Sequence, residues 1–150
     1  MSSPKRFRDS ARARVLGPAR KGPGVPVPVY LARVECGFPS PADDYLEGVL
    51  DLNDLCIDDE AATFFVRASG TSMVGAGIHD GDLLVVSRAQ EAEDQDIVIA
   101  AHGGDMTVKR LVRREGRWWL MPESARHMPV EVDMELEVWG VVTHVIHETQ

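Results

Sequence analysis

A short turn rich in small residues could present a nucleophile to a substrate. It lies between a strand-like run, residues 63–68, and a glycine-rich segment, residues 74–77. Three hydroxyl side chains compete for the role, Ser69, Thr71 and Ser72, and Ser72 is nearest to the glycines. A hydroxyl is a weak nucleophile until a base removes its proton. The turn therefore needs a basic partner elsewhere in the chain.

A lysine in a second strand-like run is the candidate base. From Gly37 onward the chain uses arginine seven times and lysine once, at Lys109. Lysine can lose its proton in a protein, whereas arginine cannot. Burial in the apolar run 106–112 would lower the lysine pKa and leave a neutral amine able to accept the hydroxyl proton. The alternative is a lysine that extends into solvent. Strand alternation does not decide between burial and exposure, because the face of the strand that carries Lys109 also carries Thr107 and Arg113 and is not uniformly apolar.

Two histidines offer a different arrangement, a Ser–His–Asp triad. His79 and His102 are both expected in turns, and neither lies in a recognisable catalytic motif. A histidine in a turn is more often solvated. The cysteines and histidines have no zinc-binding spacing, so neither a metal nor another cofactor is expected.

The pattern of short apolar runs predicts a mainly β fold, a barrel-like or sandwich-like domain with one short helix. The helix is expected from Ser40, a good cap followed by Pro41, to about Leu50. Gly140 is expected to mark a bulge in the last strand. No apolar run is long enough to span a membrane, and no secretory signal is evident. The expected strands are residues 63–68, 83–86, 97–100, 106–112, 117–121 and 136–146, with hairpin connections at 102–105 and 115–116.

The N-terminal part differs from the rest in charge. Residues 1–36 hold eight basic and two acidic residues, a net charge of +6, whereas the other 114 residues are net acidic. Residues 1–24 are rich in Arg, Ser, Pro and Gly and are expected to be mostly disordered. Residues 25–31 alternate proline with apolar side chains, which favours an extended arm that can lie in a groove or form an edge strand.

Several segments together resemble the LexA/UmuD family of self-cleaving serine peptidases. A second group of segments is similar to the UmuD branch in particular. The resemblance covers the chain from about Val29 to the C-terminus. The family segments are ASGTSM at 68–73, GIHDGDLLVV at 77–86, DIVIAA at 96–101, TVK at 107–109 and VWGVVTHV at 138–145; those of the UmuD branch are CGFPSPADDY at 36–45 and DLN at 51–53.

The resemblance implies a specific chemistry. Ser72 would be the nucleophile, Lys109 the general base, and the Cys36–Gly37 bond the site of self-cleavage. The fold would be the LexA/signal-peptidase-like β-domain, over residues 37–150, preceded by a removable arm, residues 1–36. Residues 1–28 are longer and more basic than the arm usual in the family.

The resemblance also implies partners and a setting. They are a RecA filament on single-stranded DNA as co-protease in the SOS response, a homodimer of the trimmed form, and a UmuC-like Y-family polymerase in translesion synthesis. The expected location is the bacterial cytoplasm. The alternatives are a non-catalytic dimerisation module and a short LexA-like phage or plasmid repressor. The N-terminal 36 residues lack helix-turn-helix periodicity, so no specific DNA binding is expected.

Overall fold

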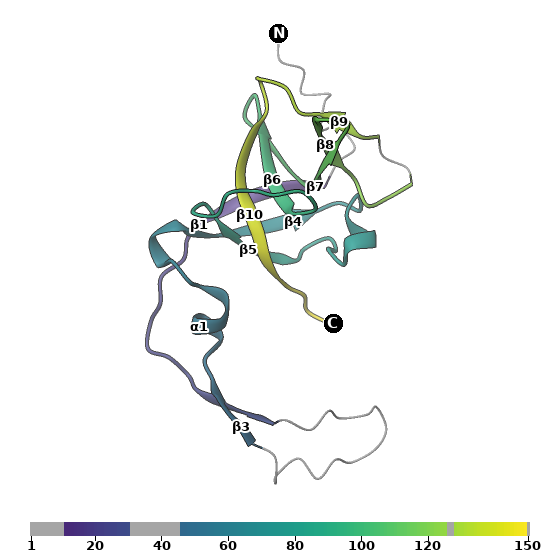
Figure 1. Cartoon of the computed structure of the whole chain (residues 1–150). Coiled ribbons are helices and arrows are strands. Elements are labelled where there is room, and N and C mark those ends of the chain that lie inside the picture. The colour runs from purple at the N-terminus through teal and green to yellow at the C-terminus, as the bar shows by residue number, and fades with distance from the viewer. Residues whose placement is uncertain (1–10, 31–45, 126–127, 150) are drawn as a thin grey trace.

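The computed structural model describes residues 11–30, 46–125 and 128–149, and it is built mainly of β-strands (Figure 1). Within these ranges one short α-helix, α1 (Leu52–Cys56), and two 3-10 turns, η3 (Glu60–Ala62) and η4 (Val74–Ala76), interrupt the strands. The strands are β1 (Arg12–Pro18), β2 (Val27–Tyr30), β3 (Leu46–Leu50), β4 (Thr63–Ser69), β5 (Leu83–Ser87), β6 (Ile97–His102), β7 (Asp105–Arg114), β8 (Arg117–Met121), β9 (Val130–Glu131) and β10 (Glu137–Ile146).

Eight strands form one sheet that closes on itself. Their order is β1-β4-β5-β10-β6-β7-β8-β9, and β1 also pairs with β7. The extra pairing joins Arg12 to Thr107 and completes a ring of six strands. The predicted barrel-like, mainly β fold is therefore confirmed. The strands β2 and β3 form a separate two-stranded sheet that extends away from the barrel (Figure 1).

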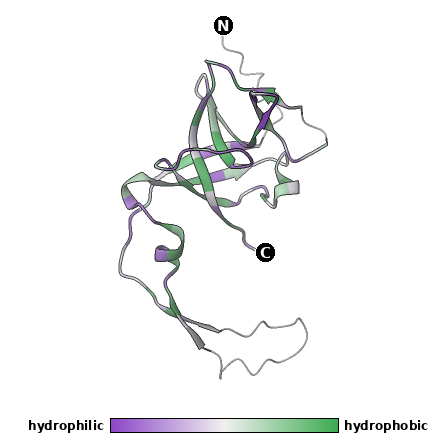
Figure 2. Ribbon diagram, in the orientation of Figure 1, coloured by the Kyte–Doolittle hydropathy of each residue, from purple (hydrophilic) through white to green (hydrophobic). Residues whose placement is uncertain are grey.

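The barrel interior is apolar. One cluster of buried side chains includes Val66, Met73, Leu84 and Val108. A second cluster, around Val98 and Leu120, lies on the other face of the sheet, because Val98 and Ile99 of the first cluster are consecutive residues of β6. Figure 2 shows the hydrophobic residues concentrated in the central strands. Burial of these clusters is the main force that holds the strands around the site described below.

The connections follow the predicted turn chemistry. Gly103 and Gly104, between β6 and β7, both have positive φ, as two-residue hairpins require. The predicted irregularity at Gly140 is also present, because the register with β6 shifts between Val138 and Gly140. A Cβ atom at Gly140 would lie 2.6 Å from Cγ1 of Val86. Only glycine therefore fits there without displacing the core.

The predicted helix over residues 40–50 is wrong in its second half. Residues 40–45 lie outside the described residues, but Leu46–Leu50 is strand β3, paired antiparallel with β2. A capping signal at Ser40 says nothing about the far end of a segment, and here pairing with β2 determines its structure. The helix begins later, at α1, where Asp51 Oδ1 accepts a hydrogen bond from Asn53 N–H.

The predicted disorder of residues 1–24 is wrong for Arg12–Pro18, which form β1. The strand pairs with β4 from Arg12 opposite Ser69 to Pro18 opposite Phe64, with a register shift between Val15 and Gly17. It is anchored at its two ends by buried alanines, Ala11 and Ala19. Low apolar content favoured disorder, yet closure of the barrel supplies backbone partners that composition does not reveal.

Candidate active site

The turn that follows β4 places Ser72 inside the molecule. Ser69 and Thr71 are exposed, whereas Ser72 is completely buried. Gly70, with φ of +95°, ends the strand, and Met73 packs into the core beneath the turn. Of the three competing hydroxyls, the structure thus directs Ser72 alone inward.

A second chain segment fixes this turn. The Ser72 carbonyl accepts a hydrogen bond from Glu123 N–H at 2.7 Å, and Gly75 N–H donates to the Glu123 carbonyl at 3.1 Å. A Cβ atom at Gly75 would lie 2.6 Å from that carbonyl oxygen, so the close approach requires glycine. Arg110 of β7 in turn forms an ion pair with the Glu123 carboxylate. The turn is therefore tied to β7, the strand that carries Lys109.

Lys109 reaches Ser72 from β7. Its Nζ lies 3.1 Å from Ser72 Oγ, and only 1% of the residue is exposed. Burial lowers the pKa of Lys109 from 10.5 to about 8. The alternative of a lysine extended into solvent is excluded, since Lys109 is one of the largest fully buried side chains among the described residues.

This arrangement can perform acid–base chemistry at a hydroxyl. A neutral Lys109 can accept the Ser72 proton at the observed distance, and with a pKa of about 8 part of the lysine is neutral near physiological pH. The hydroxyl would then act as a nucleophile without histidine.

No helix within the described part of the chain is both long and apolar enough to cross a membrane.

Sequence reasoning missed an occupant of the site, Ala11. Its N–H donates to Ser72 Oγ at 2.7 Å. Its carbonyl accepts from Val108 N–H at 3.2 Å and from the Thr107 hydroxyl. An extended backbone thus already lies beside the nucleophile, between β4 and β7. No local sequence signal marks Ala11, because these contacts bridge some 60 to 100 residues of chain.

The two predicted histidines lie elsewhere, and the predicted cleavage site is not described. Cys36 and Gly37 are outside the described residues, between β2 and β3. His79 contacts Asp82, and the His102 ring contacts Glu135. The side-chain nitrogen at hydrogen-bond distance from Ser72 Oγ is that of Lys109. This contact favours a Ser–Lys pair over a Ser–His–Asp triad.

Comparison with known proteins finds relatives over most of the chain. A family model described as Peptidase S24-like matches residues 28–143. Protein ImpA of Salmonella typhimurium is 51% identical over 124 residues, 82% of this chain and 85% of that protein. Protein MucA of Escherichia coli is 43% identical over 125 residues, 81% and 85% of the two chains. LexA repressor 1 of Pseudomonas putida is 36% identical over 126 residues, 82% of this chain and 60% of the repressor.

These matches cover most of the chain, including the turn with Ser72 and the strand with Lys109. The resemblance to the LexA/UmuD family, seen first in short motifs, is confirmed. The chain belongs to the S24 family of peptidases, the LexA/UmuD-like self-cleaving serine peptidases of SOS mutagenesis.

Proposed function

We propose that this protein cuts its own chain once, between Cys36 and Gly37, with Ser72 as nucleophile and Lys109 as general base. The observation that carries the proposal is the buried contact between Ser72 Oγ and Lys109 Nζ, 3.1 Å apart. A desolvated lysine beside a hydroxyl is the arrangement that such chemistry requires.

The proton transfers follow from this contact. Lys109 Nζ takes the Ser72 proton while Oγ attacks the carbonyl carbon of Cys36. Lys109 then returns the proton to the departing nitrogen of Gly37, which leaves an acyl-enzyme at Ser72. Water, activated by the same amine, hydrolyses that ester and frees the serine. The backbone N–H of Ser72 is the candidate donor to the developing oxyanion.

The arm needs a way to reach the site. The contacts of Ala11 illustrate how an extended backbone can lie against β7, with its carbonyl held by Val108 N–H. We propose that the segment before Cys36 docks in the same manner, as an added strand. Because the scissile bond is tethered, its effective concentration at Ser72 is high. The polypeptide hydrolysed is thus part of the same molecule or of a second copy.

The regulatory setting is the SOS response. We propose that a RecA filament on single-stranded DNA favours the cleavable pose of the arm without supplying catalytic groups. The trimmed form, residues 37–150, would form a homodimer and act with a UmuC-like Y-family polymerase in the bacterial cytoplasm. The relatives ImpA and MucA support this setting at the level of the family.

Incubation of the purified protein at alkaline pH tests the cleavage directly. Near pH 10, about two units above the folded pKa of Lys109, the lysine is neutral and a 36-residue fragment should appear. Addition of RecA, ATP and single-stranded DNA should give the same fragment near neutral pH. An intact chain under both conditions would favour the alternative of a non-catalytic dimerisation module.

A further inference from the structure

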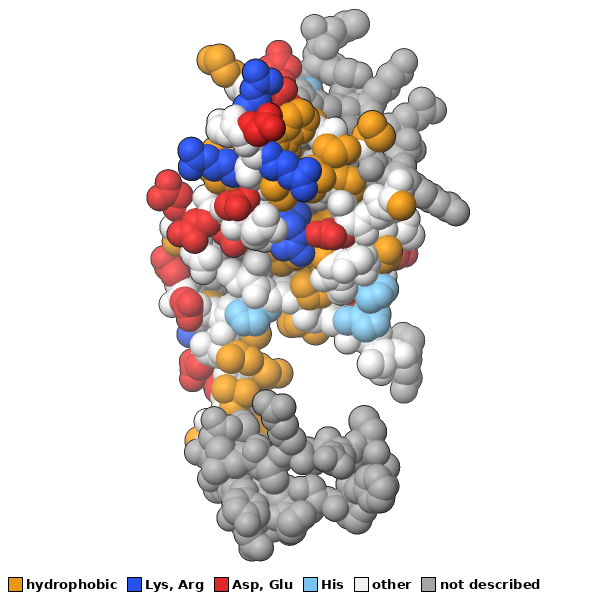
Figure 3. All heavy atoms as spheres, turned by 45° about the vertical axis from the view of Figure 1, so that its right-hand side comes forward, with side chains coloured by type: hydrophobic (Ala, Val, Ile, Leu, Met, Phe, Trp, Pro, Cys, Tyr) orange, Lys and Arg blue, Asp and Glu red, His pale blue; other side chains and the backbone are white. Residues whose placement is uncertain are grey.

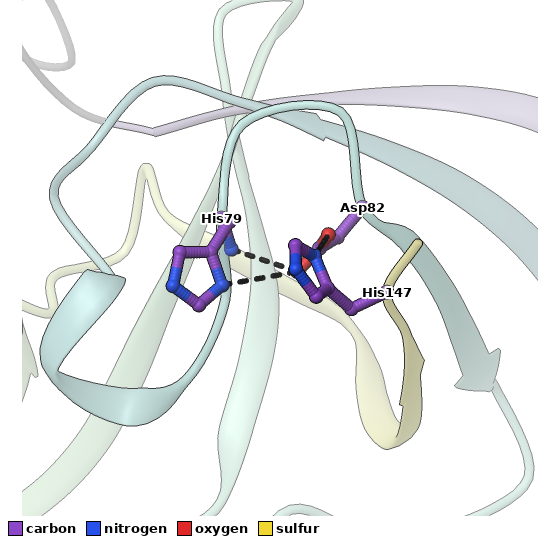
Figure 4. Close-up of side chains that lie close together, drawn as sticks. All are labelled: His79, Asp82 and His147. Carbon is purple, nitrogen blue, oxygen red and sulfur yellow. Dashed lines mark hydrogen bonds and ion pairs between the residues drawn. The ribbon is translucent and has the colours of Figure 1, made fainter. Parts of the chain in front are cut away.

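A cluster of three potential metal ligands lies outside the proposed active site. Figure 4 shows His79 and Asp82, from the turn before β5, facing His147, which follows the end of β10. Nδ1 of His147 is 2.6 Å from Oδ1 of Asp82, and Nδ1 of His79 is 3.7 Å from Oδ2. One ligand atom from each residue lies within 4.8 Å of the others.

The burial of the three side chains suits an ion that enters from solvent. The Asp82 side chain is only 2% exposed, whereas those of His79 and His147 are 50% and 46% exposed. The His79 N–H donates to Asp82 Oδ2 at 2.8 Å, so the carboxylate is held in place. The carboxylate is therefore fixed, while the more exposed imidazole rings can adjust.

We propose that His79, Asp82 and His147 form a binding site for a divalent transition-metal ion, with Zn²⁺ the best chemical match. Two imidazoles and one carboxylate are ligands that Zn²⁺ accepts, and a fourth position stays open to water. Tetrahedral ligands about 2.0–2.2 Å from the metal are about 3.3 Å apart, a spacing that modest rotation of the rings provides. The ion would take the place of the hydrogen bond between His147 Nδ1 and Asp82 Oδ1.

Charges around the cluster bear on its affinity. The carboxylates of Asp80 and Glu148 line the adjoining hollow and favour a cation. Arg67 lines the same hollow and opposes it, although its Nη1 donates to the Gly81 carbonyl.

The site would join the end of β10 to the turn that supports Ser72. Ile78 N–H donates to the Met73 carbonyl, next to Ser72. Gly70 N–H donates to Asp80 Oδ1 on the other side of the same turn. A metal ion bound to His79 and Asp82 would therefore restrain both sides of the loop that holds the nucleophile.

Calorimetric titration of Zn²⁺ into untagged, metal-stripped full-length protein tests the site. Ser72→Ala in all samples prevents self-cleavage during the measurement. We expect one saturable Zn²⁺ per chain, and His79→Asn or His147→Asn should each weaken the affinity at least about tenfold. His144→Asn is the matched control, since His144 lies on β10 three residues earlier and contacts Thr143. Its affinity should be unchanged.

Replacement of Zn²⁺ by Co²⁺ supplies a second readout. A tetrahedral site gives intense visible absorption, which the two ligand variants should lose while retaining native circular dichroism. Absence of saturable binding, or equal binding by the native-like His79→Asn, His147→Asn and His144→Asn variants, would overturn the proposal.

A separate observation concerns the access to Ser72. Ala11 lies beside the proposed nucleophile. Its N–H donates a hydrogen bond to Ser72 Oγ and so occupies one acceptor position of that oxygen. We infer that Ala11 is an autoinhibitory occupant that must leave before the scissile bond can enter. This inference rests on the proposed function. Departure of Ala11 removes little apolar contact, because its buried side chain is a single methyl group.

Thiol labelling at position 72 measures this occupancy without any cleavage. In a Ser72→Cys, Lys109→Ala background, modification of residue 72 is followed by peptide mass. Removal of residues 1–11 leaves β1 intact and should speed the modification at least about tenfold if the closed form dominates. Arg14→Ala, an exposed change on β1, should leave the rate unaltered. Equal rates with and without residues 1–11 would overturn the inference, whatever the fate of the Cys36–Gly37 bond.

Discussion

The barrel and the β2–β3 segment are built in opposite ways. In the barrel, Ser72 and Lys109 are almost completely buried among apolar strands. In the outlying segment, Val27 of β2 is 52% exposed and Val49 of β3 is 71% exposed, and α1 contains no buried residue. Figure 3 shows hydrophobic side chains at the surface where this segment leaves the barrel.

The difference in burial suits the two roles proposed here. A Ser–Lys pair needs a fixed, dehydrated setting, because only desolvation makes the lysine a usable base near neutral pH. A substrate arm needs the reverse, contacts weak enough to exchange between poses. The same chain can therefore carry a rigid catalyst and a loosely attached substrate.

Loss of the nucleophile should have the largest effect. Ser72→Ala removes the attacking oxygen and should reduce self-cleavage by about a thousandfold or more. Ser69→Ala and Thr71→Ala are matched controls, since both hydroxyls are exposed on the same turn. Gel analysis of the 36-residue fragment over time measures all three. Cleavage by Ser72→Ala at the wild-type rate would place the nucleophile elsewhere.

The pH dependence of cleavage should report Lys109. The rate should rise with pH to a midpoint near the folded pKa of about 8 and then level off, because the neutral amine is the active form. Lys109→Arg retains the charge but cannot act as a base, so it should abolish cleavage throughout this range. A wild-type rate that falls from pH 7 to pH 9 would contradict the role of Lys109.

The buried lysine should also cost stability. Below pH 8 the folded protein either buries a charged lysine or gives up the lysine proton, and both cost free energy. The free energy of unfolding of Lys109→Met should therefore exceed that of the lysine form by up to about 3 kcal/mol. Between pH 8 and 10.5 the unfolded chain binds more protons than the folded chain. The free energy of unfolding of the lysine form therefore rises with pH, and its difference from that of Lys109→Met decreases. Urea unfolding in a Ser72→Ala background measures this; a gap that widens with pH would refute it.

A valine-to-alanine substitution, made once in the barrel and once in the β2–β3 segment, should have the smallest effect and compares the burial of the two regions directly. Val66→Ala opens a cavity in the barrel and should lower the free energy of unfolding by about 2 kcal/mol. Val49→Ala, at an exposed position of β3, should change it by less than about 0.5 kcal/mol. Equal losses in urea unfolding would mean that the outlying segment is packed as tightly as the barrel.

The sequence indicated the barrel strands well, because apolar runs are local signals. The lone lysine after Cys36 marked a candidate base, and the family resemblance singled out Ser72, the residue whose hydroxyl that lysine contacts. The failures have one physical cause, long-range pairing. Strand β3 follows a helix-capping motif, and β1 lies in a segment of low apolar content, yet each becomes a strand through a partner distant in sequence. The His79–Asp82–His147 cluster escaped notice for the same reason.

The N-terminal residue of the protein after DNA damage in its host is the most direct test of self-cleavage by Ser72. Cleavage between Cys36 and Gly37 should give a shortened chain that begins at Gly37 and is absent when Ser72 is replaced by alanine. A chain that keeps its original N-terminus under damage, or one that is shortened equally with Ser72→Ala, would contradict it.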